Sequence, residues 1–165
     1  MLTRRHVFWA GASALALFIA NRLFGPPSVS QAAETFEVSH SDAEWRSLLT
    51  SAQYAVLRQE ATERPFSSPL DHEQRPGTFA CAGCDLPLFS STTKFDSRTG
   101  WPSFWQPLDD AIGTSEDTFL AMKRTEVHCR RCGGHLGHVF NDGPPPTGLR
   151  YCMNGVAMTF KSATA

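Results

Sequence analysis

The chain has 165 residues, which is enough for one domain with a substantial core and a short extension. Its apolar fraction of 41% and charged fraction of 19% are those of an ordinary soluble globular protein. Three of the 15 basic residues and no acidic ones lie in residues 1–32, so residues 33–165 carry 12 basic and 16 acidic side chains. A domain of that negative charge lacks the basic surface expected of a nucleic-acid binder.

The first 32 residues have the features of an export signal. Arg4 and Arg5 precede an uncharged apolar run over residues 7–20, and small residues offer a cleavage site after Ala32. That run is shorter than the ~20 residues a membrane-spanning helix needs. The paired arginines resemble the twin-arginine signal, which exports folded proteins from the bacterial cytoplasm. We therefore expect residues 33–165 to work in the periplasm or cell envelope, with an uncleaved membrane anchor as the alternative.

Residues 40–64 predict two peripheral helices. Ser41 and Glu44 have the Ser-x-x-Glu spacing of a capping box, which marks the start of the first helix. The second helix must end before Pro65, because the residue before a proline disfavours helical backbone. The apolar residues that recur at helical spacing, and that we expect to face the core, are Trp45, Leu48, Leu49, Tyr54, Val56 and Leu57.

The C-terminal half is predicted to be mainly β. Residues 109–117 are expected to form an acidic loop, and short apolar or β-branched runs separated by turn residues follow it. The expected strands are Thr118–Met122, Thr125–His128, Gly137–Phe140, Leu149–Met153 and Val156–Phe160. The pattern indicates a mainly antiparallel β domain with the helices at its N-terminal side.

The five cysteines divide into two Cys-x-x-Cys pairs and one single residue. The pairs are Cys81/Cys84 and Cys129/Cys132, with 44 residues between them. This doubled spacing is typical of a four-thiolate structural zinc site, here with each pair on its own hairpin. A closed site of this kind stabilises a fold and leaves no open position for catalysis. Two disulfides, or one redox-active pair, are the alternative for an exported protein.

Cys152 remains as a candidate reactive thiol, against the alternative of a buried structural cysteine. Arg150 lies two residues away and would share a strand face with it. A cation there favours the thiolate and would lower the pKa of Cys152, as a nucleophile requires. His135 and His138 could supply a proton donor.

Four motifs lie around the cysteine pairs. They are Gly-Trp-Pro-Ser-Phe (100–104), His-Leu-Gly-His-Val-Phe (135–140), Asp-Gly-Pro (142–144) and Gly-Leu-Arg-Tyr-Cys-Met-Asn-Gly (148–155). From about residue 40 to Phe160 the chain resembles the B-type peptide methionine sulfoxide reductases. The resemblance implies a fold of two small antiparallel sheets and one structural zinc ion per chain, held by the four paired cysteines. It also implies reduction of the R epimer of methionine sulfoxide in oxidised proteins or peptides.

The resemblance assigns roles to the motif residues. Cys152 is implied to attack the sulfoxide sulfur and to become a sulfenic acid, a reversible oxidation state. His135 and His138 are implied to hold or protonate the sulfoxide oxygen. Arg150 is implied to favour the thiolate, and Asn154 to position the thiolate or the bound oxygen.

Substrate binding and re-reduction are implied in the same way. Trp101 would supply the apolar wall for the substrate's methyl group, with Phe140 supporting it. Many members of the family carry a cysteine directly before Gly-Trp-Pro-Ser-Phe, which resolves the sulfenic acid as an internal disulfide, but this chain has Thr99 there. We therefore expect an external thiol, such as a thioredoxin-like protein, to re-reduce Cys152, and we expect the enzyme to be a monomer.

Two other classes of function stay open on the residues alone. A zinc-ribbon-like binding module would carry basic and aromatic residues beside its cysteine pairs, and this chain has Arg130-Arg131 there. A sulfoxide-binding or thiol-sensing protein would have the same pocket without turnover. Loss of sulfoxide reduction in Cys152→Ser separates an enzyme from both.

Overall fold

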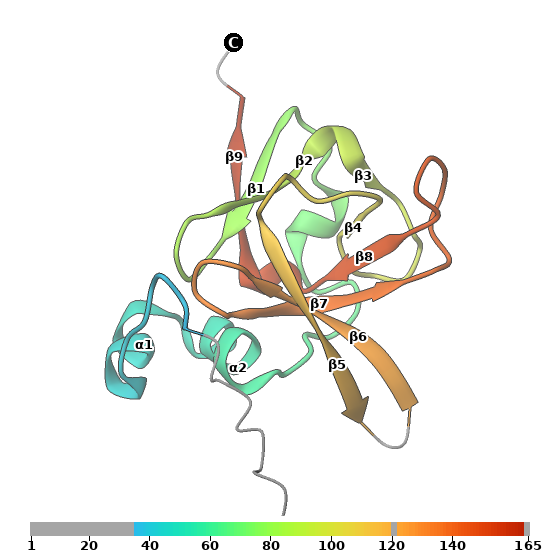
Figure 1. The fold of residues 1–165 in the computed structure, drawn as a ribbon. Helices are drawn as coiled ribbons and strands as arrows, with labels where there is room; N and C mark the ends of the chain where they lie inside the picture. The colour runs from blue at the N-terminus through green and yellow to red at the C-terminus, as the bar shows by residue number, and fades with distance from the viewer. Residues whose placement is uncertain (1–34, 120–121, 164–165) are drawn as a thin grey trace, which may run out of the picture. The chain divides into compact units, whose positions relative to one another are not determined.

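The computed structural model describes residues 35–119 and 122–163 (Figure 1). The predicted export signal at residues 1–32 lies outside this part of the chain. In the described part, the chain forms two short helices followed by two antiparallel sheets. The predicted fold class, mainly β with peripheral N-terminal helices, is confirmed.

Both helices begin at complete capping boxes. In α1 (Asp42–Leu48) the Ser41 hydroxyl accepts a hydrogen bond from the backbone N–H of Glu44, and in α2 (Ser51–Gln59) Thr50 does the same for Gln53. Each cap offsets backbone donors that a helix start leaves unpaired. Within residues 35–119 and 122–163, none of the helices has the length and apolar character that spanning a membrane requires.

One residue of the predicted helical stripe faces solvent. Trp45 and Leu49 are buried as expected, but the Leu48 side chain is 60% exposed. The reason is that α1 ends at Leu48, and Leu49 adopts an extended conformation as its C-cap. Leu49 therefore enters the core from outside the helix, and the three residues do not share one helical face.

The smaller sheet has the strand order β2-β1-β9, formed by Pro87–Ser90, Gly77–Cys81 and Met158–Ser162. Its central strand, β1, pairs antiparallel with both neighbours, so the end of the chain returns to lie beside its first strand. The 3₁₀ turn η1 (Pro69–His72) precedes β1 in the chain, and the 3₁₀ turn η2 (Ser91–Thr93) follows β2.

The larger sheet has the order β3-β4-β8-β7-β6-β5. Its strands are Lys94–Phe95, Ser103–Phe104, Arg150–Met153, His135–Phe140, Met122–Cys129 and Ile112–Phe119. The prediction of an acidic loop over residues 109–117 was wrong for most of its length, because residues 112–117 belong to β5. Acidic residues there pair across the hairpin with basic ones, Glu116 with Lys123 and Asp117 with Arg124, which keeps a charged strand compatible with the sheet.

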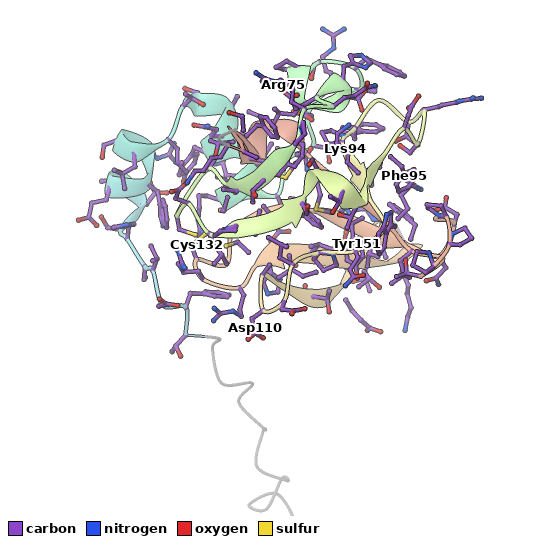
Figure 2. All side chains as sticks on the ribbon, turned by 90° about the horizontal axis from the view of Figure 1, so that it is seen from above. Arg75, Lys94, Phe95, Asp110, Cys132 and Tyr151 are labelled. Atoms are coloured by element: carbon purple, nitrogen blue, oxygen red, sulfur yellow. The ribbon has the colours of Figure 1, made fainter. Side chains whose placement is uncertain are left out.

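Aromatic rings between the two sheets form the centre of the core. Phe79 of β1, Phe89 of β2 and Phe104 of β4 have no exposed surface, and the rings of Phe89 and Phe104 stack with centroids 4.3 Å apart. The ring of Tyr151, on β8, extends this cluster, with its centroid 6.0 Å from that of Phe89. Figure 2 labels Tyr151 among the side chains of the fold. Because strand side chains alternate, the inward position of Tyr151 places its neighbours Arg150 and Cys152 on the opposite face of the sheet.

Candidate active site

Cys152 lies in the middle of the larger sheet. Strand β8 runs between β4 and β7, and Cys152 is opposite Ser103 on one side and His138 on the other. Gly137 of β7 approaches β8 so closely that a Cβ atom there would lie 2.1 Å from the carbonyl oxygen of Cys152. A glycine at this position is therefore needed for the pairing that brings His138 beside Cys152.

A cavity of about 140 Å³ opens beside the Cys152 thiol. Its lining residues are Thr62, Trp101, Arg124, Gly137, His138, Phe140, Cys152 and Asn154. The volume suits the end of one side chain rather than a whole peptide. Of the residues singled out in the sequence, the structure brings Cys152, His138, Asn154, Trp101 and Phe140 to this cavity. His135 and Arg150 stand next to it without lining it.

His138 is held by a carboxylate. Its Nε2 lies 2.8 Å from Oδ2 of Asp117, and Nη2 of Arg124 donates to the same oxygen at 2.6 Å. Burial lowers the pKa of His138, although the hydrogen bond with Asp117 opposes that effect. His138 is thus oriented by a partner from the neighbouring hairpin.

His135 has its own carboxylate. Its Nδ1 lies 2.9 Å from Glu126, which also contacts His128 and accepts a hydrogen bond from Ser115. Burial favours the neutral form of Glu126, but the hydrogen bonds from His128, His135 and Ser115 outweigh it and hold the pKa of Glu126 far below its usual range. Nε2 of His135 is buried with no hydrogen-bond partner among the described residues, and its ring packs edge-on against His138.

Arg150 forms an ion pair with Asp142 in addition to lying near the Cys152 thiol. Two hydrogen bonds of 2.9 Å join the guanidinium to both carboxylate oxygens of Asp142, and the guanidinium lies 4.4 Å above the Phe140 ring. Burial raises the pKa of the Cys152 thiol, and the lowering effects of Thr99, Arg150 and Ser103 do not offset it. Arg150 thus favours the thiolate, as expected, but burial of the thiol outweighs that contribution and sets the net direction of the pKa.

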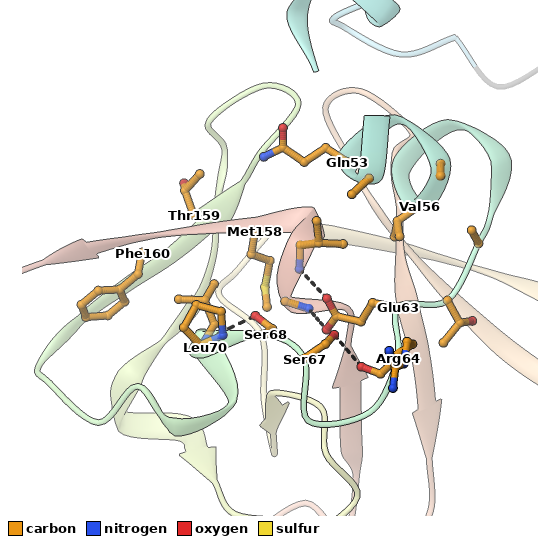
Figure 3. A pocket seen from close by; sticks show the side chains of 17 residues that line it. Gln53, Val56, Glu63, Arg64, Ser67, Ser68, Leu70, Met158, Thr159 and Phe160 are labelled. Carbon is orange, nitrogen blue, oxygen red and sulfur yellow. Dashed lines mark hydrogen bonds between the residues drawn. The ribbon is translucent and has the colours of Figure 1, made fainter. Parts of the chain in front are cut away.

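Glu63, which follows α2, holds several residues of the site in place. This role was not predicted from the sequence. The Glu63 backbone N–H donates to Asn154 Oδ1 at 2.9 Å, and its carbonyl accepts from Trp101 Nε1 at 3.2 Å. Its carboxylate oxygens accept hydrogen bonds from the backbone N–H groups of Gly155 and Val156, with N···O distances of 2.6 and 2.9 Å (Figure 3).

Those two N–H groups begin the 3₁₀ turn η3 (Gly155–Ala157), whose N-cap residue is Asn154. The Asn154 side chain makes no capping bond and instead donates to the carbonyl of Leu136 at 3.0 Å. Glu63 thus caps the turn in place of Asn154, which leaves the Asn154 amide at the cavity. Glu63 itself lines a second, largely apolar cavity of about 640 Å³ between α2 and β9 (Figure 3). Sequence could not find this link, because Glu63 lies 91 to 93 residues from Asn154, Gly155 and Val156.

The four paired cysteines form a second centre. Cys81 ends β1 and Cys129 ends β6, so each pair sits in the turn of its own hairpin, as predicted. All four sulfur atoms lie within 4.8 Å of one another, and the cross-pair distances are 3.7 Å for Cys81–Cys132 and 3.4 Å for Cys84–Cys129. Thiolates about 2.3 Å from one tetrahedral ion are separated by roughly 3.8 Å, so these sulfurs could hold a metal ion. The backbone N–H of Gly83 points at the Cys81 sulfur at 3.4 Å, as thiolate ligation favours.

Comparison with known proteins identifies close relatives. Residues 49–162 match the SelR domain family. The chain is 53% identical over 126 residues to the peptide methionine sulfoxide reductase MsrB of Agrobacterium fabrum, covering 76% of this chain and 93% of that protein. It is 57% identical over 119 residues to the protein of the same name from Pseudomonas putida strain W619, with coverages of 72% and 90%. For that of Leptospira interrogans the identity is 51% over 127 residues, with coverages of 76% and 97%.

Replacing Glu63 tests its capping role. Glu63→Gln presents an amide N–H₂ to one of the two backbone donors, and an unsatisfied donor of this kind costs about 1–2 kcal/mol of unfolding free energy. Chemical denaturation should show this loss. Glu116→Gln is the matched control, because its ion pair with Lys123 spans 3.9 Å between exposed side chains and should change stability by less than ~0.5 kcal/mol. Equal stability of the two variants would contradict the capping role.

Proposed function

Because the chain belongs to the SelR domain family and shares more than half of its aligned residues with peptide methionine sulfoxide reductases, it is an oxidoreductase that reduces methionine-R-sulfoxide to methionine, and we propose that Cys152 alone carries the redox chemistry. The observation that supports this proposal is the division of the cysteines. Four sulfurs gather at one potential metal site, and the fifth lies at the small cavity. Thr99 occupies the position from which many family members supply a second cysteine.

The proposed reaction begins at the sulfur of the substrate. The Cys152 thiolate attacks the sulfoxide sulfur while its oxygen takes up a proton, since an unprotonated oxide is a poor leaving group. The oxygen ends on Cys152 as a sulfenic acid, methionine leaves, and the cysteine sulfur has lost two electrons. An external thiol then attacks the sulfenic sulfur, releases water and forms a mixed disulfide, which a second thiol reduces.

The cavity residues divide the remaining work. His138 and Asn154 line the cavity beside the thiol, where His138 is placed to hold and protonate the sulfoxide oxygen and Asn154 to position the thiolate or the bound oxygen. His135 supports His138 through the contact between their rings. Trp101 and Phe140 give the cavity apolar walls for the methyl group. Arg150, held by Asp142, contributes positive charge near the thiolate.

We assign the metal site to one structural zinc ion per chain, held by Cys81, Cys84, Cys129 and Cys132. The closed set of four thiolates suits zinc and leaves no position for substrate. The ion would join the β1–β2 turn to the β6–β7 turn and so connect the two sheets. Its contribution is to folding and not to the reaction.

The proposal extends to the substrates, the reductant and the location of the enzyme. The expected substrates are oxidised proteins or peptides, and the expected reductant is a thioredoxin-like protein or another external thiol that reaches Cys152 directly, with the enzyme acting as a monomer. We propose that residues 1–32 export the chain as a folded protein, so that the metal is bound before the thiols meet the oxidising periplasm.

A stereospecific assay tests the proposed function. With dithiothreitol as the only reductant, the full-length enzyme should reduce the R epimer of a methionine sulfoxide peptide and leave the S epimer. Cys152→Ser should fall to the uncatalysed rate, because it removes the nucleophile. Turnover by Cys152→Ser would show that another residue attacks, and equal loss of both epimers would refute the assigned stereochemistry.

Metal content tests the zinc assignment. Elemental analysis should find about one zinc per chain, and Cys81→Ser should lose the metal and unfold at a lower temperature, because a structural zinc adds to folding free energy. Cys152→Ser is the control and should keep both metal and thermal stability. A metal-free protein with the four cysteines in disulfides would overturn the assignment.

Fractionation tests the export proposal. Replacing Arg4-Arg5 with Lys-Lys should retain the protein in the cytoplasm, because the twin-arginine pathway depends on the paired arginines. An unchanged distribution between cytoplasm and periplasm would count against this route.

A further inference from the structure

Three hydroxyl groups connect the Cys152 thiol to a backbone carbonyl. Thr99 Oγ1 lies 3.9 Å from Cys152 Sγ and 2.8 Å from Ser97 Oγ. Ser97 Oγ lies 2.7 Å from Ser103 Oγ, which donates to the carbonyl of Trp101 at 3.0 Å. Ser103 is fully buried, so these contacts are shielded from water at one end.

The direction of each bond follows from the number of protons. A hydroxyl has one hydrogen, and the Trp101 carbonyl can only accept. Ser103 therefore donates to Trp101 and accepts from Ser97, and Ser97 in turn accepts from Thr99. The Thr99 oxygen is then left to accept the S–H of Cys152. In the thiol state all hydrogens of the row point away from the sulfur.

Ionisation of Cys152 requires the first of these bonds to reverse. A thiolate can only accept, so Thr99 must rotate its O–H toward the sulfur. Ser97 can then donate to Thr99 and gives up its hydrogen bond to Ser103, while Ser103 keeps its bond to Trp101. Rotation about C–O bonds achieves this with no movement of heavy atoms. The new hydrogen bond from the Thr99 hydroxyl to the thiolate is charge-assisted. It is stronger than the weak hydrogen bond from the thiol S–H to the Thr99 oxygen, which it replaces.

We propose that the Thr99–Ser97–Ser103 row is a reversible hydrogen-bond chain that stabilises the Cys152 thiolate, and that Thr99 is therefore a catalytic residue of this enzyme. The inference rests on the proposed role of Cys152 as the nucleophile. Thr99 then does more than stand in the place of a missing second cysteine. Its hydroxyl takes part in forming the thiolate that starts the reaction.

The other groups around the thiol are already engaged. Arg150 on β8 is paired with Asp142, and His138 on β7 and Arg124 on β6 both contact Asp117. Their positive charge is therefore partly offset by carboxylates. Burial raises the pKa of Cys152, and the hydrogen bond from Thr99 opposes that effect together with Arg150 and Ser103. A neutral hydroxyl thus stabilises the thiolate alongside the nearby cation.

The pH dependence of Cys152 alkylation tests the proposal. Iodoacetamide labelling of the full-length, metal-loaded protein would be followed on the Cys152 peptide by mass spectrometry. Thr99→Val keeps the shape but removes the hydroxyl, and should raise the pKa of Cys152 by about one unit and slow labelling at pH 7 about tenfold. Thr99→Ser keeps the hydroxyl and should stay close to the wild type. Thr92→Val removes a remote exposed hydroxyl, paired with Ser90, and should change nothing.

Ser97→Ala tests the second step of the chain. It should raise the pKa of Cys152 less than Thr99→Val does, and the double variant should resemble Thr99→Val alone, because Ser97 acts through Thr99. Equal shifts in Thr99→Val and Thr99→Ser, or no shift in either, would overturn the proposal. If Thr99→Val does not fold, an unchanged profile in Ser97→Ala overturns it. Alkylation of Cys152 does not require a sulfoxide. The pKa shift can therefore be measured even if the enzyme does not reduce methionine sulfoxide.

Discussion

The pairing of β8 with β4 and β7 is the constraint on which the site depends. It fixes Cys152 between Ser103 and His138, and it does so only because Gly137 allows the β7 backbone to approach the Cys152 carbonyl. The alternation of side chains then sends Tyr151 and Met153 into the core and Arg150 and Cys152 to the cavity face. The same interaction therefore builds the hydrophobic core and positions the nucleophile.

Carboxylates from other elements hold the polar residues of the site in place. Asp117 on β5 orients His138 and Glu126 on β6 orients His135. Glu63 after α2 positions Asn154 and Trp101 through its backbone groups, while its carboxylate caps the turn that follows Asn154. None of these three acids lines the cavity beside the thiol. Asp117 and Glu63 each fix residues that line it, and Glu126 fixes His135, which contacts the lining residue His138. The β5–β6 hairpin and the segment that follows α2 thus both position residues of the cavity, although neither carries the nucleophile.

The features that could be predicted from the sequence are those that depend on short local patterns. Capping boxes, the doubled Cys-x-x-Cys spacing and the motif around Cys152 each act over a few residues, and they led to the helices, the metal cluster and the family. Long-range contacts were missed, because the link from Glu63 to Asn154 spans 91 residues and the β5 strand is too charged to read as one. The net direction of the Cys152 pKa was also missed, since sequence shows a neighbouring arginine but not the depth of burial.

The central claim is that Cys152 works without a second cysteine of its own chain. Mass spectrometry after one equivalent of methionine-R-sulfoxide, with no reductant present, tests it most directly. The wild type should gain one oxygen, located on Cys152, whereas Thr99→Cys should instead lose two hydrogens, because the introduced thiol takes the place of a hydroxyl 3.9 Å from Sγ and can close a disulfide. A wild-type disulfide between Cys152 and any of Cys81, Cys84, Cys129 or Cys132 would contradict both the single-cysteine mechanism and the metal assignment.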